Sequence, residues 1–225
     1  MSTNAADPPS PPESTPELAA LLAGYRRFRQ SGWVPHRERW ATLNQGQQPP
    51  VMVIACSDSR VDPAQIFDVA PGEIFVVRNV AALVPPFETS PGHHGVSAAL
   101  EFAVQTLKVR EVVVMGHGMC GGCQAALTRA LHGTEPGKGG FVAHWIAMLD
   151  DVREPIAQAL GVEGREAERA MERAAVKVSL ANLRTFPFVQ EKEASGELRL
   201  RGAHFAISDG VLHLLDEATG EFAPA

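Results

Sequence analysis

The chain has 225 residues, 45% of them hydrophobic, so it is long enough for one sizeable globular domain and short for two. Its formal net charge is −6 and the sequence has no basic stripe, which argues against a nucleic-acid-binding protein. No apolar run reaches the 18 or so residues that a membrane-spanning helix needs.

Residues 1–15 are rich in Pro, Ser and Glu, and we predict that they form a mobile arm ahead of a single α/β domain over residues 16–225. The segment lacks the basic start and apolar centre of a secretory signal, so we expect a soluble, cytoplasmic protein. From Pro16 onward the sequence predicts a helix, because its apolar residues recur at intervals of three and four. These residues are Leu18, Leu21, Leu22, Tyr25 and Phe28. This helix packs either on a partner subunit or on its own domain, and the sequence leaves both open.

Three short apolar runs follow, over residues 51–55, 74–77 and 112–115. They are β-branched and continuous rather than alternating, as is typical of strands buried on both faces of a parallel sheet. Residues 93–107 between them have helical periodicity. The alternation predicts an α/β layer fold.

The remainder of the chain completes this architecture. Residues 141–150 and roughly 165–186 are predicted helices, and the tail over residues 198–222 alternates as a strand does. The turn Ser208-Asp209-Gly210 allows residues 211–215 to return as an antiparallel strand. We therefore expect a central parallel sheet flanked by helices, with a C-terminal antiparallel extension.

Two of the predicted strands end in residues that suit metal chemistry. The first ends in Cys56-Ser-Asp58-Ser-Arg60 and the third in Gly-His117-Gly-Met-Cys120. Functional sites of open parallel sheets lie at the carboxyl ends of strands, so adjacent strands would bring these segments together. Thiolate and imidazole suit zinc, and three protein ligands leave a fourth position open, as in catalytic sites.

Other interpretations of these residues remain open. Cys56 alone could be a small buried hydrophobe and His117 a structural histidine. Cys120 and Cys123 form a C-x-x-C pair that could be redox-active, although Cys123 is more simply a helix-packing residue. The pattern G-x-G-x-x-G at residues 116–121 has the form of a dinucleotide fingerprint, but Glu135, its acidic partner by spacing, falls in a Gly/Pro-rich loop.

The order C-x-D-x-R followed by H-x-x-C resembles the β-carbonic anhydrases. The similarity continues through residues 71–80, through Gly121-Gly122 after the second cysteine, and through residues 207–210 near the end. It covers about residues 16–216. The resemblance implies a tightly associated dimer or a higher assembly, and reversible hydration of carbon dioxide to bicarbonate by a zinc-bound hydroxide. The related substrates carbonyl sulfide and carbon disulfide remain alternatives.

The resemblance also implies roles for single residues. One zinc ion per chain would be held by Cys56, His117 and Cys120. Asp58 and Arg60 would form a catalytic pair, in which Asp58 accepts a hydrogen bond from the hydroxide and Arg60 keeps Asp58 ionised. A surface salt bridge is the alternative for that pair. The substrate-binding positions would be Gln47, Phe75, Val80 and Phe102, with the apolar pocket partly supplied across the dimer interface.

At several positions this sequence differs from the family pattern, and each difference leads to a prediction. Phe102 stands where related proteins often have Tyr, so no hydroxyl acts there. Some bacterial members bind bicarbonate at a regulatory site with a Trp and a Tyr, but Val53 and Phe205 occupy those positions here, with Arg78 retained. We therefore expect no regulation of that type. His93 and His94 either shuttle protons or begin a helix.

Overall fold

The computed structural model describes residues 15–225, and its contacts divide into two compact units, one ending at Gln47 and one spanning Gln48–Ala225. The predicted arm falls almost wholly on residues 1–14, which lie outside the described residues. The single domain expected over residues 16–225 stays a prediction. Within the part of the chain described, no helix is both long and apolar enough to cross a membrane.

The first unit is helical, and its main helix begins where the sequence predicts. Its elements are α1 (Pro16–Phe28), the π-helical turn η1 (Arg29–Trp33) and α2 (Arg37–Leu43). The Thr15 side chain accepts a hydrogen bond from Leu18 N, and Pro16 occupies the first helical position. Both features are favourable at a helix start, where the first backbone N–H groups have no partner within the helix. The Thr15 side chain accepts from one of these groups, and Pro16 has no N–H group.

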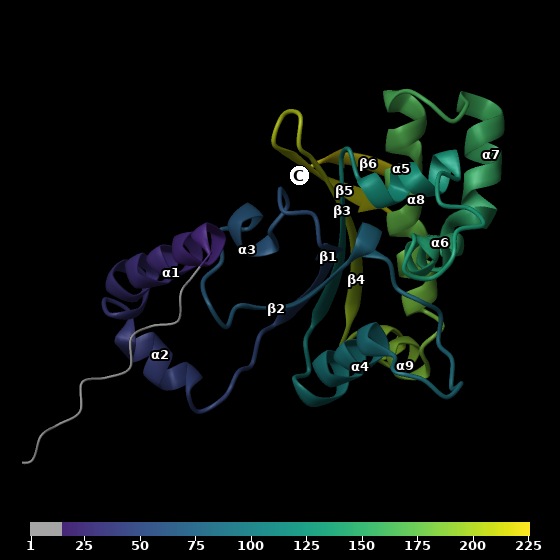
Figure 1. Ribbon diagram of the computed structural model, residues 1–225. Coiled ribbons are helices and arrows are strands. Elements are labelled where there is room, and N and C mark those ends of the chain that lie inside the picture. The colour runs from purple at the N-terminus through teal and green to yellow at the C-terminus, as the bar shows by residue number, and fades with distance from the viewer. Residues whose placement is uncertain (1–14) are drawn as a thin grey trace, which may run out of the picture. The chain divides into compact units, whose positions relative to one another are not determined.

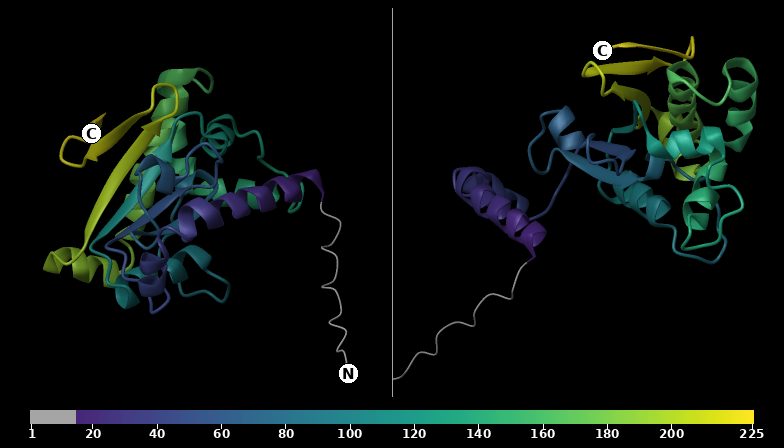
Figure 2. Two further views of the ribbon diagram at one scale, coloured as in Figure 1. Left: turned by 90° about the vertical axis from the view of Figure 1, so that its left-hand side faces the viewer. Right: turned by 45° about the horizontal axis from the view of Figure 1, so that its top comes forward.

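The second unit contains a six-stranded sheet in the order β2-β1-β3-β4-β5-β6 (Figure 1). The first four strands in this order are parallel, while β5 and β6 are antiparallel and form one edge, yellow in Figure 2. This confirms the predicted parallel sheet with its antiparallel extension. The strands are β1 (Val51–Cys56), β2 (Ile74–Asn79), β3 (Glu111–His117), β4 (Arg199–Ala206), β5 (Val211–Asp216) and β6 (Glu221–Pro224).

The helices of this unit follow the predicted order, with additions. The predicted helix over residues 93–107 is α4 followed by a π-helical turn, and that over 165–186 is α8. The predicted helix over 141–150 is α6 followed by the turn η4, and the sequence analysis missed α3, α7 and α9. The elements are α3 (Pro63–Ile66), η2 (Val80–Ala82), α4 (Gly95–Glu101), η3 (Phe102–Thr106), α5 (Gly121–Thr128), α6 (Gly140–Ile146), η4 (Ala147–Leu149), α7 (Asp150–Leu160), α8 (Arg165–Leu183) and α9 (Pro187–Ser195).

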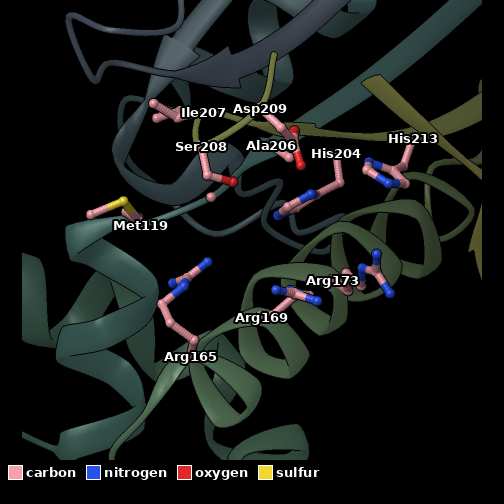
Figure 3. A pocket seen from close by; sticks show the side chains of 11 residues that line it. Met119, Arg165, Arg169, Arg173, His204, Ala206, Ile207, Ser208, Asp209 and His213 are labelled. Atoms are coloured by element: carbon pink, nitrogen blue, oxygen red, sulfur yellow. The ribbon is translucent and has the colours of Figure 1, made fainter. Parts of the chain in front are cut away.

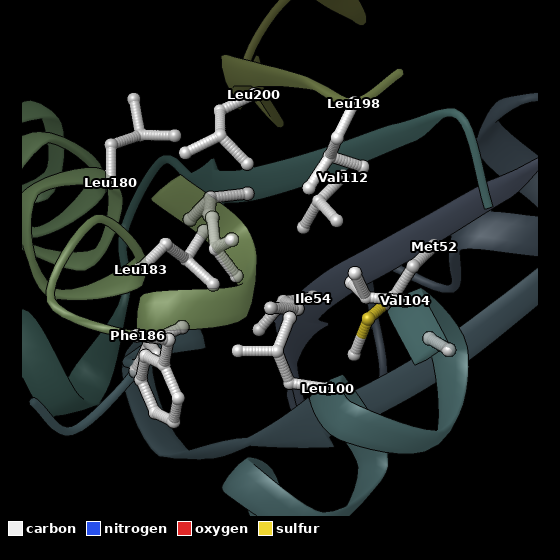
Figure 4. Packing of buried hydrophobic residues seen from close by; sticks show 14 of the residues in the cluster. Met52, Ile54, Leu100, Val104, Val112, Leu180, Leu183, Phe186, Leu198 and Leu200 are labelled. Carbon is white, nitrogen blue, oxygen red and sulfur yellow. The ribbon is translucent and has the colours of Figure 1, made fainter. Parts of the chain in front are cut away.

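The larger core lies between one face of the sheet and helices α4, α8 and α9 (Figure 4). On the other face, Val53 and Ala55 of β1 belong to a second buried cluster. Strand β1 is thus covered on both sides, as its continuous apolar sequence indicates. This covering fixes the position of its last residue, Cys56. The residues of the larger core labelled in Figure 4 are Met52, Ile54, Leu100, Val104, Val112, Leu180, Leu183, Phe186, Leu198 and Leu200.

Candidate metal centre

The ends of β1 and β3 bring together two segments that are far apart in the sequence. Cys56 is the last residue of β1 and His117 the last of β3, and the two strands pair in parallel. After His117 the chain turns sharply, because Met119 adopts a left-handed conformation with φ of 59°. Helix α5 then begins with Cys120 as its N-cap residue. This turn returns Cys120 toward the strand ends.

Three potential ligand atoms converge there. One atom each from Cys56, His117 and Cys120 lies within 4.8 Å of the others, and the two sulfur atoms are 4.0 Å apart. All three residues are buried, with exposed fractions of 6%, 1% and 3%. The structure therefore juxtaposes the three residues that the sequence analysis selected.

The orientation of the His117 ring indicates which nitrogen is available to a metal. Its Nδ1 lies 2.9 Å from the Gly118 carbonyl oxygen, which can only accept, so Nδ1 carries the proton. Nε2 is buried without a hydrogen-bond partner among the described residues. An orphaned buried nitrogen is costly, and a metal ion would satisfy it. A backbone carbonyl that accepts from the other ring nitrogen is the usual support for a ligating histidine.

The thiols need a cation to lose their protons in this environment. A hydrogen bond with the Cys120 thiol and burial raise the pKa of Cys56 to about 12. The pKa of Cys120 is raised to about 12 as well, with its hydrogen bond to Cys123 as the largest cause. Two cysteines and one histidine are ligands that zinc prefers. The donor set and the orphaned nitrogen therefore fit zinc.

Asp58 and Arg60 form a bidentate pair beside this group. Arg60 Nε and Nη2 donate to the two carboxylate oxygens of Asp58 at 2.9 and 2.6 Å. The Arg60 amide also donates to Asp58 at 2.9 Å. These bonds hold the pKa of Asp58 well below its usual range. Arg60 Nη2 additionally donates to the Met119 carbonyl at 3.0 Å, which ties the pair to the turn between the ligands.

Arg78 stabilises the backbone around Cys56 and Asp58. The sequence analysis noted this residue only because it is retained from the regulatory site of some bacterial family members. It lies on β2, next to β1, and its Nε donates to the Cys56 carbonyl at 2.9 Å. Its Nη2 donates to the Asp58 carbonyl at 2.7 Å, and its Nη1 to Asp62 at 3.0 Å. One guanidinium group therefore fixes the backbone on both sides of Ser57.

Glu172 of α8 was not selected from the sequence, yet it supports the ligand turn. It is 2% exposed, and its Oε1 accepts from the Met119 amide at 2.6 Å. Its Oε2 accepts from His204 Nε2 at 3.0 Å, and Arg165 donates to Oε1 at 3.3 Å. Burial opposes the charge, but the bonds from His204 and Arg165 outweigh it and lower the pKa of Glu172. Glu172 lies among the buried, mostly apolar residues of α8. A charged residue on the apolar face of a predicted helix is the feature by which the sequence analysis could have selected it.

Two glycines near the ligands are required by packing. A Cβ on Gly116 would lie 2.7 Å from Val176 Cγ2 of α8, so this glycine allows β3 and α8 to approach closely. A Cβ on Gly122 would lie 2.7 Å from Val80 Cγ1. Gly116 is the first glycine of the G-x-G-x-x-G pattern, so its close contact with α8 gives that glycine a packing role that needs no dinucleotide.

The expected substrate-binding residues are only partly gathered within one chain. Phe75 and Phe102 contact each other, with ring centroids 5.9 Å apart. Phe75 lies four residues before the end of β2, roughly 13 Å along the strand from the residue that pairs with Cys56. Val80 lies against Gly122 at the start of α5, beside Cys120. Gln47 belongs to the first unit.

Comparison with known protein families adds to this geometry. The model of the carbonic anhydrase family matches residues 51–212. The chain is 34% identical over 195 residues to beta carbonic anhydrase 3 of Arabidopsis thaliana, covering 86% of this chain and 75% of that protein. It is also 34% identical over 187 residues to the mitochondrial beta carbonic anhydrase 6 of the same plant, covering 82% of this chain and 63% of that longer protein.

Solved structures give the same result. The β-carbonic anhydrase CcaA is similar with a TM-score of 0.85 at 28% identity, covering 93% of this chain and 92% of that one. CafA, a β-carbonic anhydrase of Aspergillus fumigatus, has a TM-score of 0.76 at 31% identity, with 89% and 91% covered. A structure of the tetrameric β-carbonic anhydrases of Sordaria macrospora has a TM-score of 0.69 at 31% identity, with 88% and 93% covered.

Proposed function

The chain belongs to the β-carbonic anhydrase family, whose members are carbonate dehydratases, and on that premise we propose that it uses one zinc ion to hydrate carbon dioxide reversibly. Cys56, His117 and Cys120 would hold the ion. The observation that carries this proposal is the convergence of the three ligand atoms within 4.8 Å around a buried, unpartnered His117 Nε2.

The chain's own residues supply the arrangement that the reaction needs. A zinc ion bound here would act as a Lewis acid that lowers the pKa of a water molecule. Asp58, held as a carboxylate by Arg60, can only accept hydrogen bonds. It would accept one from the attacking oxygen and so direct the lone pair of that oxygen at carbon dioxide. The bonds from Arg78 to the Cys56 and Asp58 carbonyls keep the ligand and the acceptor in register.

A second subunit would complete the site. Val80 and Phe102 are 37% and 44% exposed, and Leu21 and Tyr25 of α1 are 71% and 56% exposed. Large apolar side chains in such number are typical of interfaces. The related proteins of Sordaria macrospora are tetrameric. We therefore propose a homodimer or a higher assembly, in which Phe75, Val80 and Phe102 line the apolar pocket and Gln47 donates to a substrate oxygen.

Two of the sequence-based expectations stay predictions. His94 is the N-cap residue of α4, the position of a residue that begins a helix, and its side chain turns away from the helix, with Nε2 at 2.9 Å from the Ser90 carbonyl oxygen. A proton-shuttle role for His93 or His94 is open to a test of buffer dependence. The cytoplasmic location is likewise a prediction, since one of the plant relatives is mitochondrial.

The test is stopped-flow hydration of carbon dioxide above about pH 8, where the nucleophile should be formed, with zinc content measured on the same samples. We expect fast turnover with one zinc ion per chain, and its loss in Asp58→Ala with zinc retained. Cys123→Ser is the matched control, because Cys123 lies outside the three converging ligands and serine keeps a hydroxyl beside Cys120, so zinc and activity should both be retained. A zinc-loaded wild-type protein without turnover would contradict the proposed function.

A further inference from the structure

Four buried side-chain polar atoms in residues 15–225 have no hydrogen-bond partner, and three of them belong to residues that line the same pocket. One is His117 Nε2, at the candidate metal centre. The other three are Arg173 Nε, His204 Nδ1 and His213 Nδ1, and all three residues line a single pocket. The pocket, shown in Figure 3, lies between α8 and the strands β4 and β5, and has a volume of about 120 Å³.

Three arginines of α8 form one wall of this pocket. Arg165, Arg169 and Arg173 are spaced four residues apart, so they lie on one face of the helix (Figure 3). Like charges at this spacing repel each other across the helix surface. Arg165 is neutralised by Glu168 and Glu172. Among residues 15–225, Arg169 and Arg173 make no ion pair, so their repulsion is not relieved in this way.

Arg173 is the more confined of the two. Its guanidinium lies 5.2 Å from the centre of the Phe222 ring, and burial together with the charge of Arg169 lowers its pKa. A confined cation with an unpartnered N–H group gains most from an anion placed nearby.

The opposite wall has little negative charge with which to neutralise the arginines. It contains His204, which is 2% exposed, and the turn residues Ser208 and Asp209 (Figure 3). Asp209 is the one carboxylate of the lining, and one of its oxygens already accepts from the Val211 amide at 3.0 Å. The two arginines without an ion pair, Arg169 and Arg173, therefore share the lining of the pocket with a single carboxylate.

We propose that this pocket binds one small oxyanion, with the guanidinium groups of Arg169 and Arg173 as its principal donors. A volume of about 120 Å³ has room for a small ion such as phosphate or bicarbonate. Guanidinium groups match the paired oxygens of both ions. Binding here requires neither zinc nor turnover, so it can fail or succeed independently of the hydratase activity.

The test is isothermal titration calorimetry of zinc-loaded protein with inorganic phosphate and, in a separate series, with bicarbonate. Arg169→Gln removes one donor from an exposed position and should leave folding intact. We expect it to weaken binding at least tenfold. Arg201→Gln is the control, because it removes the same charge from an exposed arginine outside the pocket, and we expect less than a twofold change.

The two series identify the source of the anion. An Arg169-dependent heat with phosphate alone assigns the pocket to a tetrahedral dianion, and one with bicarbonate assigns it to the product of the proposed reaction. An anion at the metal centre would contribute equally to wild type and both variants. In ¹⁵N spectra, the Nε–Hε signal of Arg173 should move on addition of the same ion. If neither anion gives a heat that Arg169→Gln reduces, or if Arg201→Gln reduces it equally, the pocket holds only water and the inference is wrong.

Discussion

Two adjacent glycines at the start of α5 allow a direct test of the packing around the metal centre. A Cβ on Gly122 would lie 2.7 Å from Val80 Cγ1 and 3.1 Å from the Ala81 Cβ, whereas a Cβ on Gly121 would meet no atom within 4 Å. Both residues lie in the first turn of the same helix. Gly122→Ala and Gly121→Ala therefore differ in the space that the new methyl group enters.

The size of the effect follows from two opposing contributions. Alanine is favoured over glycine in a helix by up to about 1 kcal/mol, and both variants gain from this. Overpacking costs about 1–3 kcal/mol where the neighbours cannot move. Val80 is β-branched and stiff, and Trp145 Nε1 donates to its carbonyl at 2.8 Å. We therefore expect Gly122→Ala to be about 1–3 kcal/mol less stable than Gly121→Ala.

The assay is thermal unfolding of the zinc-loaded variants at one protein concentration, because bound metal and assembly both contribute to apparent stability. At about 2–4 °C per kcal/mol for a chain of this size, the melting temperatures should differ by roughly 2–12 °C. Equal stability, or a more stable Gly122→Ala at the same zinc content, would refute the close contact between α5 and Val80.

Two further predictions concern protons. Because the metal-free thiols of Cys56 and Cys120 have pKa values of about 12, zinc must displace two thiol protons, and the raised pKa of His117 adds part of a third. The logarithm of the apparent zinc affinity should therefore rise by about two to three per pH unit near neutrality. Competition with a chelating dye measures this, and a pH-independent affinity would contradict it. The lowered pKa of Glu172 means that its carboxylate stabilises the fold above its ordinary pKa near 4.3 and that this contribution is lost as pH falls below that value. Glu172→Gln should cost about 1.5–3 kcal/mol at pH 7, and urea unfolding should show the difference from wild type shrinking only below about pH 4; a constant difference would oppose the assignment.

The sequence predicted the ligand-bearing edge of the sheet because its signals are local. Continuous β-branched runs indicated β1 and β3, and the residues that close each run proved to be neighbours, with Cys56 and His117 at paired strand ends. The bidentate pair of Asp58 and Arg60 is also local, since the two residues are separated by one position.

The supporting contacts could not be predicted because they join distant segments. Arg78 reaches the Cys56 carbonyl from the neighbouring strand, and Glu172 reaches the Met119 amide from a helix 53 residues further along the chain. No period or spacing encodes such contacts. The pocket around Phe75 and Phe102 could not be predicted for a different reason. The two rings contact each other within one chain, but the pocket is expected to include residues of a second subunit.

The division of the ligands between two segments sets an order of events during folding. His117 and Cys120 lie three residues apart and can meet in any chain that forms the turn at Met119, but Cys56 precedes His117 by 61 residues. Its arrival depends on the pairing of β1 with β3, a non-local contact whose loop must close before the strands can hold each other. The complete three-ligand site therefore exists only once the centre of the sheet is assembled, and the free energy of the proposed zinc binding would stabilise the same strand pair that creates the site.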